Sequence, residues 1–216
     1  GLGLGFEDLD AIFVTHEHAD HIKGVRSLQK KSGIPVFMTY GTAVAGKCLD
    51  LPRLSILEGF KAVVVGDLEV QPIAVPHDAR EPCQFIVNQH RNPSSAKLGL
   101  LTDLGSFTPH IISAYAECDA VVLECNHDEE KLEQGPYPYS LKQRVRSDWG
   151  HLSNAQASQL LASFDSEKLQ WIVIAHISQK NNSSALAREA LEAVFPFRDK
   201  IIMADQDTGF PWLELA

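Results

Sequence analysis

The sequence predicts an α/β protein built as a layered sandwich rather than as a doubly wound sheet. Strand-like runs dominate the middle of the chain, and helical patterns mix with them towards both ends. No strand-like run is followed by the glycine-rich phosphate loop of a doubly wound nucleotide-binding sheet. The length of 216 residues suffices for one domain with a full core, so residues 1–216 are expected to form a single domain.

The predicted strands are apolar runs bounded by turn residues, and the predicted helices carry apolar residues at helical spacing. The strands are expected over residues 11–14, 36–38, 62–65, 68–75, 84–88, 98–102, 120–124, 171–175 and 200–203. The helices are expected over residues 22–31, 42–49, 109–116, 154–164 and 184–195. Ser153 and Ser183 precede the last two helices, where a hydroxyl can accept a hydrogen bond from a free amide. Residues 134–149 are expected to form an ordered surface excursion.

The composition excludes a membrane protein and constrains the compartment. No apolar stretch approaches the ~20 residues that a membrane helix needs, so no membrane partner is expected. The four cysteines are scattered and no secretory signal opens the chain, which favours a reducing, cytoplasmic location. The net charge of −9 does not indicate a nucleic-acid surface, although bound divalent metals would add positive charge that residue counting omits.

The most informative motif is His-Glu-His-Ala-Asp-His at residues 16–21. It places three histidines and an aspartate directly after the apolar run 11–15, which is expected to be a buried strand. Neutral imidazole and carboxylate are ligands that zinc, manganese and iron accept. The motif therefore predicts a metal site at the end of a strand.

Three further candidate ligands stand where later strand-like runs end. His77 follows the run 68–75, Asp103 follows 98–102, and His176 follows 171–175. Taken singly, Asp103 has an ordinary alternative as a turn residue, and the two histidines as partly buried structural side chains. Strand ends on one edge of a sheet converge, so together with the motif at 16–21 they favour a shared metal site.

This order of residues resembles the metallo-β-lactamase superfamily. The resemblance implies a four-layered αβ/βα sandwich with a dinuclear site at one edge. It implies that one metal is held by His16, His18 and His77, the other by Asp20, His21 and His176, and that Asp103 bridges both. The expected cofactors are two divalent ions, with zinc favoured by the imidazoles and manganese or iron permitted by the carboxylates. Positions remain for a bridging water and for substrate.

Later motifs are similar to the YycJ (WalJ) branch of that superfamily, over almost the whole chain. They lie at residues 76–79, 102–105, 123–128, 135–138, 141–144, 150–154 and 176–182. The branch is described as metal-dependent hydrolases, with DNA exonuclease activity attributed to it. The family normally has an N-terminal strand pair before the histidine motif, whereas this chain starts fifteen residues before His16. We therefore expect those strands to be missing or truncated, leaving a sheet edge unpaired.

Glu124 and His151 resemble the glutamate and histidine that assist phosphodiester cleavage in ribonuclease Z enzymes. In the mechanism that follows, two cations about 3.5–4 Å apart hold the attacking and leaving oxygens, and their bridging hydroxide attacks phosphorus. Asp20 orients the nucleophile or takes its proton, His151 protonates the departing alkoxide, and Glu124 holds the other ring nitrogen of His151. The ordinary alternatives are a residue stacked before a helix for His151 and a solvated strand-end carboxylate for Glu124.

A short basic run precedes His151. Lys142, Arg144 and Arg146 are predicted to bind substrate phosphates through charge-assisted hydrogen bonds, with a solvated charged face as the alternative. The expected partner is therefore DNA or a small phosphodiester, and the sequence also permits a homo-oligomer.

The leading hypothesis is a phosphodiesterase, specifically a DNA exonuclease. The alternative is an acyl hydrolase of the same fold, such as a thioesterase, a lactonase or a glyoxalase II-like enzyme. Asp103 argues against zinc β-lactamases, many of which have cysteine at that ligand position. His18 argues against redox di-iron proteins of this fold, which usually have glutamate there. The intact ligand set argues against a non-catalytic metal-binding module, and the Glu124–His151 pair favours phosphate over acyl substrates.

Overall fold

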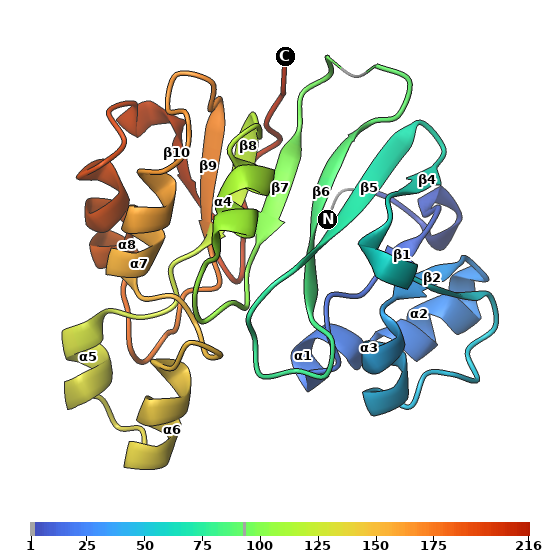
Figure 1. Ribbon diagram of the computed structural model, residues 1–216, viewed down its shortest axis with the longest axis horizontal. Helices are drawn as coiled ribbons and strands as arrows, with labels where there is room; N and C mark the ends of the chain where they lie inside the picture. The colour runs from blue at the N-terminus through green and yellow to red at the C-terminus, as the bar shows by residue number, and fades with distance from the viewer. Residues whose placement is uncertain (1–2, 93) are drawn as a thin grey trace.

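The computed structural model describes residues 3–92 and 94–216, which form two β-sheets packed face to face with helices outside them (Figure 1). The larger sheet has the strand order β10-β9-β8-β7-β6-β5-β4. Its strands are β4 (Val63–Val65), β5 (Leu68–Ala74), β6 (Cys83–Gln89), β7 (Leu98–Leu101), β8 (Ala120–Glu124), β9 (Trp171–Ala175) and β10 (Ile201–Met203). Strands β7 to β10 run parallel, and β4 to β7 pair antiparallel.

The smaller sheet is parallel throughout and has the order β1-β2-β3. Its strands are β1 (Ile12–Phe13), β2 (Val36–Met38) and β3 (Leu54–Ile56). Successive side chains of β2 face opposite ways, as the period of a strand requires. Val36 and Met38 join the apolar cluster with the helices, whereas Phe37 packs towards the larger sheet.

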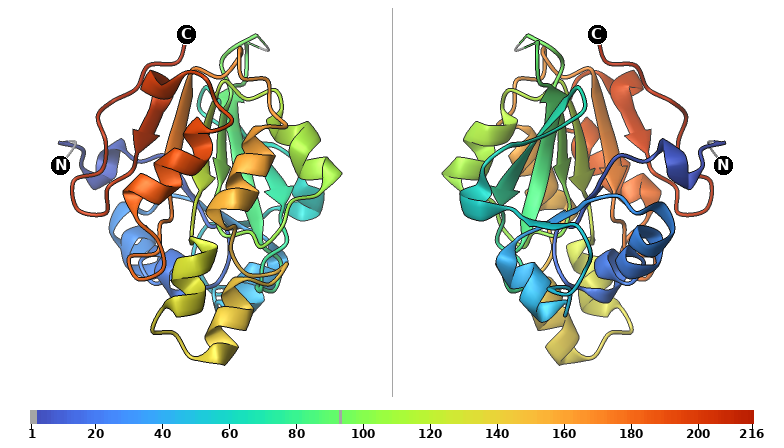
Figure 2. Two further views of the ribbon diagram at one scale, coloured as in Figure 1. Left: turned by 90° about the vertical axis from the view of Figure 1, so that its left-hand side faces the viewer. Right: turned by 90° about the vertical axis from the view of Figure 1, so that its right-hand side faces the viewer.

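The helices lie in two outer layers and at one end of the sandwich (Figure 1). They are α1 (Ala19–Ile22), α2 (Val25–Ser32), α3 (Tyr40–Ala45), α4 (Pro109–Tyr115), α5 (Glu129–Gln134), α6 (Tyr139–Val145), α7 (Asn154–Leu161) and α8 (Ser184–Glu192), with 3-10 turns at Phe6–Asp8, Glu58–Phe60 and Arg198–Lys200. Helices α4, α7 and α8 cover the outer face of the larger sheet, while α2 and α3 pack on the smaller one (Figures 1 and 2). Helices α1, α5 and α6 are found at that end (Figure 1). The predicted four-layered sandwich is confirmed.

Aromatic side chains join the two sheets. The ring of Phe13 on β1 stacks on Phe37 of β2 with centroids 4.7 Å apart, and meets Phe85 of β6 edge-on at 5.5 Å. Offset and edge-on contacts of this kind are the arrangements that aromatic pairs prefer. Because residues 16–21 follow β1 closely in the chain, this packing fixes the position of the histidine motif against the larger sheet.

Phe85→Ala is expected to lower the free energy of unfolding by about 3–5 kcal/mol, because it empties a buried ring position between the sheets. Phe85 is 3% exposed. Urea unfolding followed by circular dichroism measures the change. Val64→Ala on β4 of the same sheet is the control, since Val64 is 45% exposed and truncation of its side chain should cost under about 0.5 kcal/mol. Equal losses in the two variants would contradict the assigned role of Phe85.

Several predicted element boundaries need correction. In place of one helix over residues 22–31, the chain forms the short helix α1 and then α2. The first hydrogen bond of α2 runs from Leu28 N to Gly24 O, so this helix begins after Gly24. Strand β3 was not predicted, because its run is short and follows an irregular turn. Helix α5 ends where the expected surface excursion over residues 134–149 begins, and helix α6 lies inside it. Neither helix was predicted. Both serine caps are confirmed: Ser153 Oγ accepts from Gln156 N, and Ser183 Oγ accepts from Leu186 N.

Strand β1 lies at the edge of the smaller sheet, and β2 is its only strand partner in the described residues. On the larger sheet, the inner face of β7 to β9 borders a cavity of about 400 Å³, which is also lined by the C-terminal segment from Gly209 to Leu215. In the described part of the chain, no helix combines the length and the apolar character needed to cross a lipid bilayer.

Candidate metal centre

The seven side chains predicted to bind metal all lie at one end of the sandwich. The loop after β1 supplies His16 and His18, and helix α1 supplies Asp20 and His21. The loops after β5, β7 and β9 supply His77, Asp103 and His176. The parallel strands β7, β8 and β9 end at the same edge, which is why their following residues meet. Within each of three triads their ligand atoms lie within 4.8 Å of one another: His16, His18 and His77; His16, His21 and Asp103; Asp20, His21 and His176.

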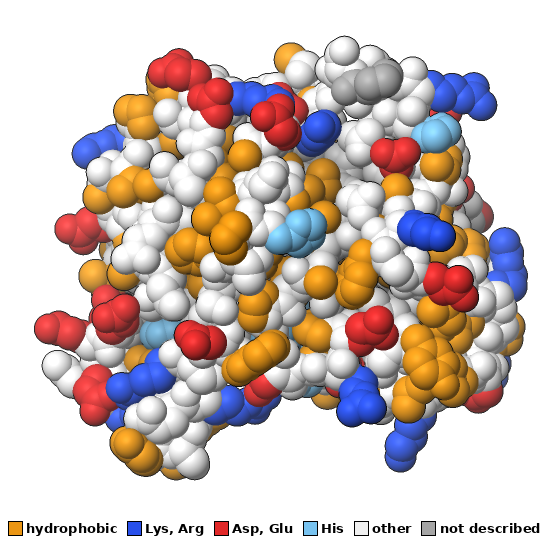
Figure 3. Space-filling model, in the orientation of Figure 1, with side chains coloured by type: hydrophobic (Ala, Val, Ile, Leu, Met, Phe, Trp, Pro, Cys, Tyr) orange, Lys and Arg blue, Asp and Glu red, His pale blue; other side chains and the backbone are white. Residues whose placement is uncertain are grey.

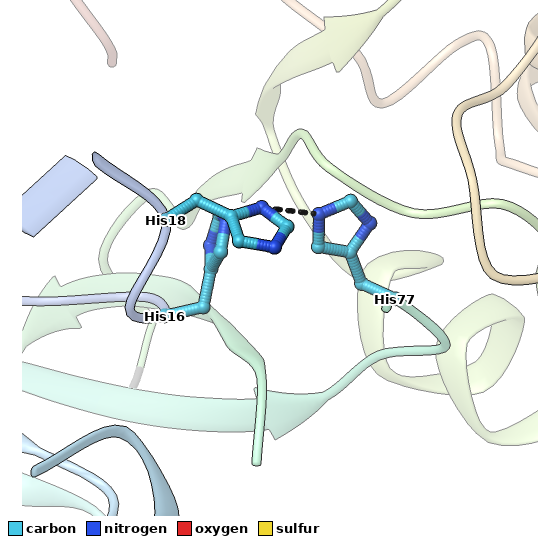
Figure 4. A group of neighbouring side chains, drawn as sticks. All are labelled: His16, His18 and His77. Atoms are coloured by element: carbon cyan, nitrogen blue, oxygen red, sulfur yellow. Dashed lines mark hydrogen bonds between the residues drawn. The ribbon is translucent and has the colours of Figure 1, made fainter. Parts of the chain in front are cut away.

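The first triad consists of imidazoles whose rings converge (Figure 4). His77 Nε2 lies 3.3 Å from His18 Nδ1, and the ring centroids of His16 and His77 are 4.8 Å apart. His77 Nδ1–H donates to Gly150 O at 3.0 Å. This hydrogen bond leaves the lone pair of His77 Nε2 directed at the other two rings, the orientation that ligating histidines usually have.

Burial favours the uncharged form of two members of this triad, His16 and His77. His16 is 1% exposed, and burial, together with the neighbouring His21, lowers the pKa of His16 to about 3. Burial also lowers the pKa of His77. A neutral imidazole is the form that binds a cation, so both side chains are in the state required of metal ligands.

Asp103 lies between the first triad and the other groups. Its Oδ2 is 3.2 Å from His21 Nε2, and its Oδ1 is 3.3 Å from His176 Nε2 and 4.0 Å from His77 Nε2. Burial alone would raise the pKa of this carboxyl, but contact with His21 and the proximity of His176 outweigh burial and lower it. Asp103 is therefore a carboxylate, placed where one side chain can reach both sets of imidazoles.

Two of these residues have strained backbones. Asp103 has φ of 52° and His176 has φ of 56°, the left-handed region that residues with a Cβ rarely adopt. Each such residue costs on the order of 1–3 kcal/mol, and such strain clusters at functional sites. His176 directly follows β9, and Asp103 follows β7 after one residue, so each turn directs its side chain back across the end of the sheet.

Glu124, at the end of β8, is fully buried and holds two imidazoles at once. Its Oε1 accepts hydrogen bonds from His151 Nδ1 at 2.9 Å and from His176 Nδ1 at 2.7 Å. Its Oε2 accepts from two backbone amides, Leu104 N and Leu152 N. From the sequence, Glu124 was expected to hold a ring nitrogen of His151, and the first of these hydrogen bonds is that contact. The hydrogen bond with His176 was not predicted. Glu124 thus orients a predicted metal ligand and the predicted proton donor together.

The Glu124 carboxylate also sets the charge of His151. Burial alone would lower the pKa of His151, but the hydrogen bond to Glu124 outweighs burial and raises it. The imidazole therefore retains its proton more readily than a free histidine does. With Nδ1 bound to Glu124, the Nε2–H group remains available to a molecule in the adjoining cavity.

The donor set fits divalent cations. One buried polar atom in the cluster, His16 Nε2, has no hydrogen-bond partner among the described residues. Unpartnered buried polar atoms are costly unless something satisfies them. Neutral imidazoles and a shared carboxylate match the ligands that zinc, manganese and iron take. Asp20 is more open, with a 70% exposed side chain whose Oδ2 lies 3.6 Å from His21 Nε2.

A cavity of about 420 Å³ adjoins the cluster and is lined by His151 and His176. Of the three basic residues predicted to contact substrate, Arg144 lines this cavity, where its Nε pairs with Asp78. Lys142 donates to the backbone oxygen of Glu133, and Arg146 pairs with the Glu133 carboxylate. These two cations are held along α5 and α6, where positive and negative side chains mix on the surface (Figure 3).

Gly150 is needed where the chain passes closest to the cluster. A Cβ at this position would lie 2.2 Å from the backbone oxygens of Arg144 and Val145. Gly150→Ala is therefore expected to displace the carbonyl that orients His77, and to weaken metal binding about 10–100-fold. Metal retained after dialysis against a competing chelator measures the change. Gly24→Ala is the matched control, because a Cβ added at Gly24 would meet no other atom within 4 Å. Equal metal retention in the two variants would contradict this role for Gly150.

Comparison with known proteins shows the family. The sequence model described as "Beta-lactamase superfamily domain" matches residues 3–177. The chain is 36% identical over 195 residues to the exodeoxyribonuclease YycJ of Bacillus anthracis, covering 88% of this chain and 72% of that protein. It is also 36% identical over 223 residues to the exodeoxyribonuclease WalJ of Streptococcus pneumoniae serotype 2 strain D39, covering 97% and 81%.

Solved structures share the fold. The metallo-β-lactamase fold protein YhfI from Bacillus subtilis superimposes with a TM-score of 0.72 at 17% identity, over 97% of this chain and 80% of that one. At this identity the similarity concerns the architecture.

Proposed function

Since this chain belongs to the beta-lactamase superfamily and is a hydrolase of the metallo-β-lactamase fold, we propose that it is a DNA exonuclease that cleaves phosphodiester bonds. One observation carries the proposal. His151, held by the buried Glu124, lines the cavity beside the ligand cluster. The alkoxide that leaves a phosphodiester is a poor leaving group and needs a proton, whereas the thiolate that leaves a thioester is stable near neutral pH.

In this proposal His16, His18 and His77 would hold one divalent cation, Asp20, His21 and His176 would hold a second, and Asp103 would serve as a shared ligand. Zinc is the proposed metal because imidazoles dominate the set, and manganese or iron are the alternatives. When bound, such cations lower the pKa of water to about 7 and offset the charge that develops on a phosphoryl group.

Four side chains are proposed to carry out the proton transfers, to orient the nucleophile and to contact the phosphate. His151 donates its Nε2 proton to the departing oxygen, and Glu124 keeps the ring in place through Nδ1. Asp20, at the open side of the cluster, orients the nucleophile or accepts its proton. Arg144, beside Asp78 at the cavity, is placed to contact a phosphate. The positive cluster that bound metals would form compensates for the acidic net charge of the chain.

The substrate class is tested by comparing three substrates with one protein preparation. End-labelled duplex DNA, bis-p-nitrophenyl phosphate and a thioester are each incubated with protein whose metal content has been measured. Progressive release of nucleotides from DNA ends is the expected result. Hydrolysis of the thioester alone would overturn the proposal in favour of an acyl hydrolase.

The proposed substrate also bears on location. All four cysteines are free and buried, as expected in a reducing compartment. Together with a DNA substrate, this supports a cytoplasmic location as part of the proposal.

A further inference from the structure

We propose that the cavity beside the ligand cluster is a binding site for one terminal nucleotide, in which the ring of Tyr137 stacks on the base and Lys180 contacts the phosphate. The inference rests on the proposed nuclease function and names the part of the substrate that this site takes. Neither residue was singled out from the sequence. Tyr137 belongs to the motif at residues 135–138, to which no role was assigned, and Lys180 lies within residues 176–182, of which only His176 was assigned a role.

The cavity has the size and position for such a ligand. Its volume of about 420 Å³ lies near the lower end of the roughly 300–1,000 Å³ typical of small-molecule sites. It extends from His151 and His176 to residues of α6 and of the loop before it. A group bound there would therefore place its phosphate at the proton donor, with the rest of the nucleotide directed towards α6.

The cavity lining has both apolar surface, which suits a base, and polar groups, which suit a phosphate. Leu141, Val145, Ile177 and the ring of Tyr137 contribute apolar surface, which suits the flat face of a base. Ser178 contributes a hydroxyl near the histidines. Its Oγ accepts hydrogen bonds from Asn181 N at 3.2 Å and Asn181 Nδ2 at 3.3 Å, so its own proton is left to donate to an oxygen of the ligand.

Of the lysine and arginine side chains that line the cavity, Lys180 is the one available to bind a phosphate. Its Nζ lies 5.9 Å from the centroid of the Tyr137 ring, within reach of a cation–π contact. Arg144, on the same cavity, is paired with Asp78. For Lys180 no ion pair is found within residues 3–92 and 94–216. A phosphate that enters the cavity therefore meets an ammonium that needs no prior separation from a carboxylate.

The contacts named for the base are a ring face and aliphatic side chains. Stacking of this kind is sequence-tolerant, because every base has a π-face. The proposed site therefore recognises that a chain end is present rather than which base it carries.

The cleavage test uses single-stranded DNA with either ordinary or abasic (tetrahydrofuran) residues at both ends. Tyr137→Ala is expected to lower kcat/KM on ordinary ends about 5- to 150-fold, the equivalent of one lost base–aromatic stack. It should leave kcat/KM on abasic ends unchanged, and Tyr137→Phe should retain activity on both. Tyr139→Ala is the control, since Tyr139 is 74% exposed and does not line the cavity. Equal losses on ordinary and abasic ends would overturn the stacking role.

A binding test separates this inference from the nuclease proposal. The affinity of the wild-type protein for dAMP should exceed that for deoxyribose 5-phosphate, and Tyr137→Ala should remove the difference. Lys180→Gln should weaken both ligands and reduce the log–log salt slope of single-strand binding by about 0.7. Absence of DNA cleavage with base-dependent dAMP binding would contradict the nuclease proposal alone. DNA cleavage with equal affinity of both ligands for the wild-type protein would contradict the nucleotide site alone.

Discussion

Replacing His151 by alanine is expected to slow DNA cleavage about 100- to 10,000-fold, the usual contribution of a positioned proton donor. The reason is the bond from His151 Nδ1 to the buried Glu124 carboxylate at 2.9 Å, which orients the ring and favours its protonated form. The loss should fall on kcat. Metal content should be unchanged, because His151 is outside the seven proposed ligands. Steady-state cleavage of end-labelled DNA and elemental analysis measure the two quantities.

A second substrate isolates the proton transfer itself. The p-nitrophenolate that leaves bis-p-nitrophenyl phosphate is stable without a proton, so His151→Ala should slow its release far less than it slows DNA cleavage. His90→Ala is the control, because His90 is on the surface and contacts Glu69. Loss of metal in His151→Ala would make His151 a ligand and would overturn its role as donor. Equal losses on both substrates would also contradict that role.

Removing Asp103 is expected to have the largest effect on metal content. In Asp103→Ala both proposed ions lose a ligand, since the carboxylate lies 3.2 Å from His21 Nε2 and 3.3 Å from His176 Nε2 and reaches towards His77. We expect metal content to fall from about two ions per chain to less than one, and DNA cleavage to fall to background. The rise in Tm on adding metal should also disappear, because metal stabilises only a folded site that can bind it.

Asp20→Ala is the comparison variant for this experiment. Asp20 belongs to the second proposed set alone and is largely exposed. Its removal should therefore leave one ion bound, together with part of the metal-dependent rise in Tm. Retention of two ions by Asp103→Ala, or equal losses in both variants, would contradict the shared position of Asp103.

The seven proposed ligands could be selected from sequence because local chemistry marks each of them. Residues 16–21 are consecutive, and His77, Asp103 and His176 each follow an apolar strand. Strand ends converge in any layered α/β fold, so their proximity needed no knowledge of detailed packing. The serine caps of α7 and α8 were predictable for a similar reason, since each depends on contacts within four residues.

The contact of Glu124 with His176 and the partners of the basic run could not be obtained in that way. Glu124 pairs with Ala175 in the register of β8 and β9, and this register places its carboxylate beside His176, 52 residues further along the chain. The partner of Arg146 is likewise decided by how α5 packs beside α6, which brings Glu133 to it. A run of positive residues in the sequence therefore did not reveal which of them faces the cavity.

By itself, the sequence of this protein determined the seven candidate ligands and the layered α/β class, because both follow from periodicity and from residues next to strand ends. Only the tertiary structure decided that one buried carboxylate orients both His151 and His176, that Arg144 faces the cavity while Lys142 and Arg146 contact Glu133, and that Tyr137 meets Lys180. These contacts depend on strand register and helix packing between distant segments, which a local pattern of residues does not specify.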